Sequence, residues 1–482
     1  MAYTKTPILV IVFCLCSIIS EAAVRGTNRR ADLNHDDEVN IADVNLVLND
    51  IMQDTNDLAL CDINSDGIVN VADLNEVLNI IFNPDIVHEP AEYVSGTLPV
   101  MHVNTAGYRT INSKEHYWQG EYWLEANGST KVLSIGSESS PLPLEIKGRG
   151  NYTWITYPKK QYKVKLTSKA ELIANTAKSK HYALQARYDD WRGYMLDAVA
   201  FQISRRIGMN WASHEEPIEL VVNGDYCGLY FLTETVRVQT GRVDITEQKD
   251  LEMKPQAVTG GWLVEHDNYI DDNQIIFDGM LYTYHSPEVL SSQQREYLQT
   301  LISNVIDAIK NRDLSTDNEW EELIDIDEYA KYCIVQEIMD NQEGYAGSCY
   351  WHKERGDNSK IVFGPVWDFG FSLRRTGEQK FSWQDNGRPI GWMKYLKNSP
   401  SLMACIRKHW QEFSQDGFDW IDNFIDNYAL NVNAATVPDN RRWPDSSSDQ
   451  YLSRVNQLKY LIHLRLDFLN SQWGDCNPDE TE

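Results

Sequence analysis

The chain of 482 residues carries 71 acidic and 44 basic side chains, so its net charge near pH 7 is −27. Affinity for nucleic acid depends on Lys and Arg side chains that neutralise phosphates, so this balance argues against a nucleic-acid partner and favours bound cations. A chain of this length also exceeds one ordinary hydrophobic core, which indicates more than one folded unit.

The first 23 residues have the pattern of a secretory signal. Lys5 precedes the apolar run PILVIVFCLCSII, and the small residues Ala22 and Ala23 follow it. The run is shorter than the roughly 20 apolar residues that span a bilayer. We therefore expect a signal peptide over 1–23 and a secreted or cell-surface protein, with a membrane or lipid anchor as the open alternative.

Six cysteines remain after residue 23, and none of them forms a C-x-x-C pair. Their spacing therefore does not predict a zinc site. An oxidising compartment permits one or two disulfides, but six cysteines allow 15 full pairings and the sequence does not choose among them.

Two similar segments lie near the N-terminus: DLNHDDEVNIADVNLVLNDI begins at Asp32, and DINSDGIVNVADLNEVLNII begins at Asp62. Each has oxygen-bearing side chains at loop positions 1, 3, 5, 9 and 12, and an apolar helical pattern follows. Alternating oxygen ligands closed by a carboxylate suit calcium. The predicted calcium ligands are Asp32, Asn34, Asp36, Asn40 and Asp43 in the first loop, and Asp62, Asn64, Asp66, Asn70 and Asp73 in the second.

No Lys or Arg occurs from Ala31 to Ser95, so only a bound cation can offset this local charge. The closing residue of each loop is Asp rather than the Glu of the usual EF-hand. Two such loop–helix units resemble a dockerin module, over residues 32–84. The resemblance implies two Ca²⁺ ions, a cohesin-bearing scaffold protein as partner, and cohesin-facing residues Ile41, Ala42, Val71 and Ala72.

After a linker at 85–96, the domain at 97–475 has strand patterns first and helical patterns later. Strands are predicted over 143–154 and 160–168, and a hairpin over 216–238 that turns at Asn223-Gly224. Helices are predicted over 190–209, 292–311, 325–340 and 449–473. This order predicts an α+β fold with two lobes and a cleft between them, beside a small all-α module at the N-terminus.

Five motifs in this domain occur in the order of a known family: LPVMHVNTAGYRTINSKEHYW, IKGRGNYTWITYPKKQYKVKL, VVNGDYCGLYFLTETVRVQTGRVDI, GGWLVEHDNY and GPVWDFGFSLRR. They resemble the spore-coat CotH kinase family. The resemblance implies an atypical, two-lobed kinase-like domain. It implies transfer of the ATP γ-phosphate, with Mg²⁺ or Mn²⁺, to Ser or Thr of extracellular proteins.

Phosphoryl transfer needs cations on the phosphates and a metal held by carboxylates. Asp340 follows a helix and Asp368 follows a strand, which is the kinase order of catalytic Asp and metal Asp. The resemblance gives Asp340 the role of base or orienter, and Asp368 the magnesium. The predicted nucleotide-binding residues are Arg149 between two glycines, Lys159 and Lys160 before a strand, Arg192 at the start of a helix, and Glu234 as partner of a lysine.

Three alternatives stay open. Tyr345 stands where kinases carry a metal-binding Asn, which allows a pseudokinase. A scaffold-bound protein can also be a non-catalytic, CotH-like component for adhesion or carbohydrate binding in a polysaccharide-degrading complex. A glycoside hydrolase needs only two suitably spaced carboxylates, although no recognisable motif indicates one.

Overall fold

The computed structural model describes residues 24–25, 31–34, 36, 38–53, 55–58, 60–63, 68–82, 94–270, 273–375, 379–383, 391–444 and 450–474. The predicted signal at 1–23, most of the linker, and the predicted ligands Asn64 and Asp66 lie outside these residues. Among the described helices, none has the length and apolar character needed to cross a membrane.

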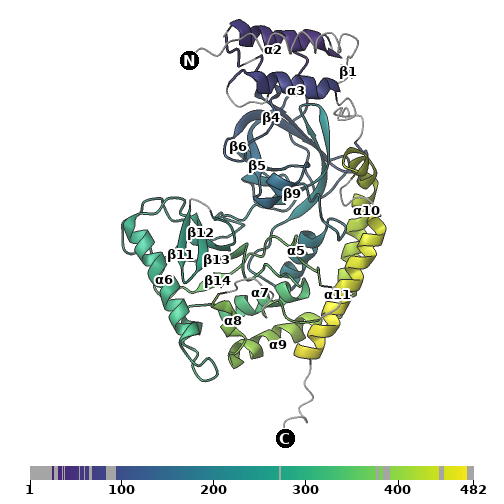
Figure 1. Cartoon of the computed structure of the whole chain (residues 1–482). Coiled ribbons are helices and arrows are strands. Elements are labelled where there is room, and N and C mark those ends of the chain that lie inside the picture. The colour runs from purple at the N-terminus through teal and green to yellow at the C-terminus, as the bar shows by residue number, and fades with distance from the viewer. Residues whose placement is uncertain are drawn as a thin grey trace.

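The N-terminal module consists of a short ladder and two helices. Strand β1 (Val24–Arg25) pairs with β2 (Glu38–Val39), and α2 (Ile41–Gln53) lies beside α3 (Val71–Phe82) (Figure 1). Val44 and Val47 of α2 meet Leu74 and Val77 of α3 in a core of their own. Both helices follow the loops that the repeat predicts, so the helical parts of the repeat are confirmed.

A closed barrel of seven strands follows, in the order β3-β4-β5-β6-β7-β9-β8. All its neighbours are antiparallel except β3 and β8, which close it in parallel. The strands are β3 (Val100–Thr105), β4 (Trp118–Glu125), β5 (Leu142–Arg149), β6 (Gln161–Ala170), β7 (Ser179–Gln185), β8 (Glu215–Val222) and β9 (Asp225–Glu234). Even-numbered residues of β5 and β6, such as Ile146 and Val164, fill the interior, so the odd-numbered ones face outward.

The predicted hairpin is confirmed, because Asn223 and Gly224 both take positive φ between β8 and β9. Two element boundaries are wrong. The strand predicted over 143–154 ends at Arg149, because Gly150 turns the chain (φ +95°) into the short helix α4 (Tyr152–Thr156). The helix predicted from 190 begins only at Leu196, as α5 (Leu196–Arg206), because Gly193 and Tyr194 have positive φ.

A second, five-stranded antiparallel sheet has the order β11-β12-β10-β13-β14. Its strands are β10 (Trp262–Asp267), β11 (Gln274–Phe277), β12 (Met280–Ser286), β13 (Cys349–Lys353) and β14 (Ile361–Phe363). Helices accompany it: α6 (Ser292–Lys310), η4 (Glu319–Glu322), α7 (Ile326–Ile338), α8 (Met393–Leu396), α9 (Pro400–Ser414), α10 (Asp419–Arg442) and α11 (Tyr451–Trp473). Strands and helices together confirm the mixed α+β class.

The largest hydrophobic core joins α5 and β9 to this sheet and to the C-terminal helices. The barrel is therefore anchored to the rest of the domain through α5, and through α10, which runs along it (Figure 1). The five cysteines among the described residues, Cys61, Cys227, Cys333, Cys349 and Cys405, are all unpaired, so no disulfide forms between them.

Candidate functional site

The end of β5 and the Asp-Phe-Gly segment belong to one charged group, which we call the Asp368 cluster: Arg149, Asp197, Glu265, Tyr350 and Asp368. Arg149 is the last residue of β5, and Asp197 lies in the first turn of α5. Glu265 and Tyr350 are paired in register between β10 and β13, and Asp368 follows β14. The cluster thus joins the barrel to the five-stranded sheet.

Asp368 is held weakly. Its carboxylate accepts hydrogen bonds from Ser348 Oγ and from the Gly370 amide, both 3.4 Å long. Its backbone is left-handed (φ +62°), a conformation that costs free energy in a residue other than Gly. Although the side chain reaches solvent, the surrounding protein raises the pKa of Asp368 to about 6, and the charge of Asp197 adds to this rise. A cation bound here would offset both the burial of the Asp368 carboxylate and its repulsion by Asp197.

Arg149 supplies positive charge to the cluster. Its charge lowers the pKa of Asp368, but among the described residues its guanidinium forms no hydrogen bond or ion pair. It lies over the ring of Trp367, with 5.4 Å between the guanidinium carbon and the ring centre. A half-buried Arg with unused donors is suited to form bidentate hydrogen bonds with an anion.

The other two carboxylates of the cluster are oriented by the fold. Asp197 accepts a hydrogen bond of 2.8 Å from the Phe369 amide and one of 2.7 Å from Arg187. It therefore fixes the Asp-Phe-Gly segment from the start of α5. Glu265 lies 2.7 Å from His285 Nε2.

A basic strip continues the cluster along the outer face of the barrel. Lys147 of β5 and Lys163 of β6 stand directly opposite each other. Like charges in this position destabilise a strand pair. The next outward pair on the same strands, Glu145 and Lys165, is complementary and forms an ion pair of 2.7 Å. Burial, together with the charges of Lys147 and Arg149, lowers the pKa of Lys163 to about 8. The strip is therefore suited to attract an anion.

Asp340, the predicted base, is buried and already paired. Arg375 binds both of its oxygens, with 2.9 Å between Nε and Oδ2, and Ser382 Oγ donates to Oδ1 at 2.9 Å. One turn earlier, Glu337 forms a buried ion pair of 3.2 Å with Arg465. The loop after Asp340 nevertheless supports the cluster, because Asn341 donates to the Asp368 carbonyl at 3.3 Å.

The other residues predicted to bind the nucleotide make their contacts with residues outside the cluster. Lys159 is buried, and its ammonium donates to Asp439 at 2.6 Å and to the Leu229 carbonyl at 2.7 Å. Lys160 donates to the Trp154 carbonyl at 2.6 Å. Glu234 is paired with His214 and Arg242, not with a lysine. Arg192 lies in the turn before α5, and it donates to the Leu373 carbonyl at 2.9 Å.

In the N-terminal loops, the closing carboxylates point inward. Asp43 accepts from the amides of Leu33 at 2.7 Å and Asn40 at 2.9 Å, and Asp73 accepts from the Asn70 amide at 2.8 Å. The first residues of both loops, Asp32 and Asp62, are also buried. Burial, and then the charge of Asp32, raise the pKa of Asp43. A donor set that includes the buried carboxylates of both loops fits a calcium ion.

Five residues of this site were missed from the sequence: Lys147, Lys163, Asp197, Glu265 and Tyr350. Asp197 is one acid within a helical pattern, and its partner Phe369 lies 172 residues away, so no local signal indicates it. Glu265 lies within the motif GGWLVEHDNY and could have been selected from it. Lys163 alternates with Lys165 in the predicted strand, where only the register against Lys147 shows that its charge is uncompensated.

A comparison with protein families matches residues 146–469 to the family described as CotH kinase protein. The match covers more than half of the chain, and the predicted membership is confirmed. The comparison with curated proteins gave no match.

Proposed function

The chain belongs to the CotH kinase protein family, and we propose that it is a metal-dependent phosphotransferase that moves the γ-phosphate of ATP to Ser or Thr of other proteins. The observation that carries the proposal is the placement of Arg149, with unused donors, beside the weakly held carboxylate of Asp368. Separate cationic and anionic groups at one site suit a phosphate and its metal ion together.

In this proposal Asp368 would hold Mg²⁺ or Mn²⁺, and the ion would supply positive charge for the phosphate oxygens. Arg149 binds phosphate oxygens, and Lys147 and Lys163 extend the attraction along the strip. Asp197 positions Phe369 and thereby Asp368. Asp340 keeps residues 368–375 in place through Arg375, so we assign it a positioning role rather than that of a base.

We further propose that the protein is secreted or attached to a cell surface, and that residues 32–84 form a calcium-binding dockerin that joins a cohesin-bearing scaffold. Val71 is 42% exposed and Ala72 is exposed, as a cohesin-facing pair must be. Ile41 and Ala42 are half-buried at the equivalent place in α2. Removal of calcium by a chelator is expected to lower the helical circular dichroism of the isolated module, and an unchanged spectrum would contradict the assignment.

One observation favours the second candidate, a non-catalytic component that binds carbohydrate. Aromatic rings gather beside α4: the ring centres of Tyr152 and Tyr157 are 5.8 Å apart, and those of Tyr157 and Tyr188 are 5.2 Å apart. Trp191, in the turn before α5, is 62% exposed. Exposed aromatic rings offer flat surfaces for sugar rings, although a protein partner would meet the same surface.

The two candidates separate in one set of binding measurements. The full chain is incubated with ATP and Mg²⁺, with ATP and Mn²⁺, or with a panel of plant oligosaccharides, and its melting temperature is recorded. We expect an increase with ATP and metal together, and phosphate transfer from labelled ATP to protein. Stabilisation by an oligosaccharide alone, without ATP binding, would refute the kinase and support the carbohydrate-binding protein.

A further inference from the structure

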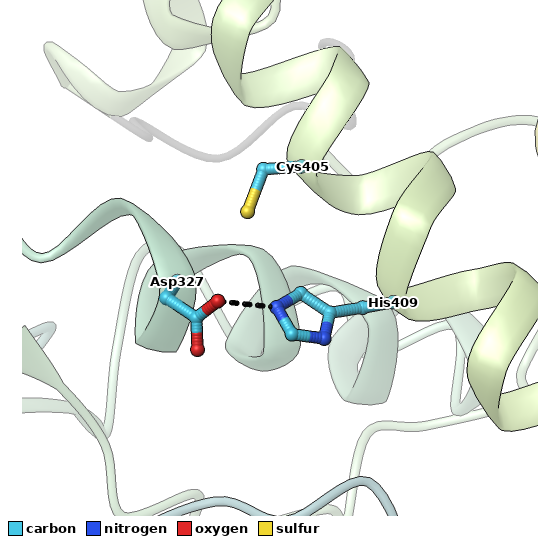
Figure 2. Close-up of side chains that lie close together, drawn as sticks. All are labelled: Asp327, Cys405 and His409. Carbon is cyan, nitrogen blue, oxygen red and sulfur yellow. Dashed lines mark hydrogen bonds and ion pairs between the residues drawn. The ribbon is translucent and has the colours of Figure 1, made fainter.

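A second group of metal-binding side chains lies between α7 and α9, apart from the Asp368 cluster. Asp327 is in the first turn of α7, and Cys405 and His409 lie on α9. One ligand atom from each of the three lies within 4.8 Å of the others. Figure 2 shows the thiol and the imidazole directed from one helix toward the carboxylate on the other.

Side chains cap the N-termini of both helices. The Asp325 carboxylate accepts from the amides of Asp327 and Glu328 and so caps α7. Ser399 caps α9, and Pro400 occupies its first turn. Cys405 and His409 are four residues apart, so they project from one face of α9. The ligand positions are therefore set by regular backbone, not by a loop.

We propose that Asp327, Cys405 and His409 bind a zinc ion that clamps α7 to α9. Thiolate, imidazole and carboxylate are the three side-chain ligands that Zn²⁺ takes in proteins, and the thiolate selects against Mg²⁺ and Ca²⁺. With these ligands the charges of the site sum to zero: two from the metal against one thiolate and one carboxylate. A water molecule completes the fourth position of a tetrahedral site.

The distance between Asp327 and His409 is close to what the ion requires. Asp327 Oδ1 and His409 Nε2 are 2.7 Å apart and share a hydrogen bond. In a tetrahedral zinc site, the same two atoms lie about 3.3 Å apart. A shift of less than an ångström thus replaces the hydrogen bond by two bonds to the metal. Cys405 Sγ faces the Ile326 carbonyl at 3.8 Å, a long contact that it can leave.

Neighbouring charged groups orient the ligands. Lys331 binds the other carboxylate oxygen of Asp327 at 2.9 Å, which leaves Oδ1 for the metal. Glu412 lies 3.7 Å from His409 Nδ1, as an ion-pair partner at the ring nitrogen that does not face Asp327. Such outer partners are typical of zinc-bound histidines. Zinc binds the thiolate, so metal binding must displace the thiol proton of Cys405.

The structure also contains a matched pair without a thiol. His463 Nε2 of α11 lies 3.0 Å from Asp422 of α10, which is the ion-pair geometry of His409 and Asp327. If the α7–α9 group were only a surface ion pair, the two sites would behave alike toward metals. We expect the two sites to differ in metal binding.

The test uses the full chain, stripped of metals and then kept in excess Ca²⁺ and Mg²⁺ so that other sites are saturated. Co²⁺ is added as a spectroscopic substitute for zinc. We expect one equivalent to give the visible bands of tetrahedral cobalt and a near-ultraviolet thiolate-to-cobalt band, and Zn²⁺ to displace it. Zinc should also raise the melting temperature. Absence of the thiolate band in the unmodified chain would overturn the proposal.

Three variants localise the site. Cys405→Ser is expected to abolish the thiolate band, whereas H463Q and Cys227→Ser are expected to keep it. Persistence of the band in Cys405→Ser would assign the metal to another cysteine and refute the site. Should Cys405→Ser fail to fold, Glu412→Gln gives a milder test, because loss of an outer partner weakens zinc affinity by roughly tenfold or more. Unchanged affinity in that variant would then count against the proposal.

Discussion

The two carboxylates predicted from the kinase order of residues differ in how far the protein satisfies them. Asp340 is bound by Arg375 and Ser382, and its neighbour Glu337 by Arg465, Tyr345 and two backbone amides. Asp368 accepts only long hydrogen bonds among the described residues, and Arg149 beside it makes none. We call the first of these regions the Asp340 region.

This contrast distinguishes charges that the fold already satisfies from charges that are open to a ligand. A buried ion pair with complete hydrogen bonding has no capacity left for a ligand, and its loss destabilises the fold. A carboxylate and an arginine that lack such hydrogen bonds carry a desolvation cost, which a bound ligand would offset. The same distinction applies to Lys159. The sequence predicted that it binds a phosphate, but in the structure its ammonium is already paired with the buried Asp439.

The largest expected effect belongs to the Asp340 region. Arg465→Met leaves the buried Glu337 carboxylate without its cation, and breaking such a pair costs about 3–5 kcal/mol of unfolding free energy. Tryptophan fluorescence during denaturation measures this loss for the large domain alone, because no Trp precedes Trp118. Lys459 lies on the same helix as Arg465 and forms an exposed pair with Asp426 of α10, so Lys459→Met should cost less than about 1 kcal/mol. Equal losses would contradict a structural role for Arg465.

Asp368→Asn is the converse test, since it removes a charge that the fold does not need. We expect phosphate transfer to fall by about 100-fold or more, or roughly 3 kcal/mol, while the melting temperature stays within a few degrees. Transfer from labelled ATP measures the activity, and Asp357→Asn, at an exposed carboxylate outside the cluster, is the control. Full activity in Asp368→Asn would show that the carboxylate is ordinary.

Arg149→Gln tests the cationic half of the Asp368 cluster. Hydrogen bonds to charged groups contribute about 1.5–3 kcal/mol, so the affinity for ATP with Mg²⁺ should weaken by roughly tenfold or more. Lys160→Gln is the matched control, because its ammonium is bound to the Trp154 carbonyl and should not contact the nucleotide. If calorimetry shows a larger loss of ATP affinity for Lys160→Gln than for Arg149→Gln, this role of Arg149 is wrong.

The last effect appears only at low pH and concerns β10, where Glu265 faces the cluster and His266, one residue on, faces the core against Tyr282 and Trp392. Burial lowers the pKa of His266 to about 3, whereas an unfolded His titrates near 6.5. Its contribution is present above pH 6.5 and is lost as the pH falls toward 3, by about 1.4 kcal/mol per pH unit. His266→Phe should therefore lose less stability than the unmodified chain between pH 6 and pH 4 in fluorescence-detected denaturation. Parallel pH profiles would show that His266 is protonated in the fold.

Local patterns account for what was predicted well. The alternation in 160–168 and the Asn223-Gly224 turn depend on neighbouring residues, and both appear as predicted. The long helices α6, α7 and α11 follow their apolar periodicity. The start of α5 was misplaced because an apolar period does not reveal the positive φ of Tyr194. Helix α10 was not predicted, and it supplies the Asp439 that binds Lys159.

By itself, the sequence determined the mixed α+β class, the two helices that follow the repeated loops, the hairpin, the family, and the candidacy of Arg149 and Asp368. Each of these depends on the order of nearby residues. Only the tertiary structure decided which charges are saturated: Lys159 meets Asp439 across 280 residues, and Asp197 meets Phe369 across 172. Side chains so far apart in the chain leave no shared local pattern, because burial and strand register, rather than spacing, bring them together.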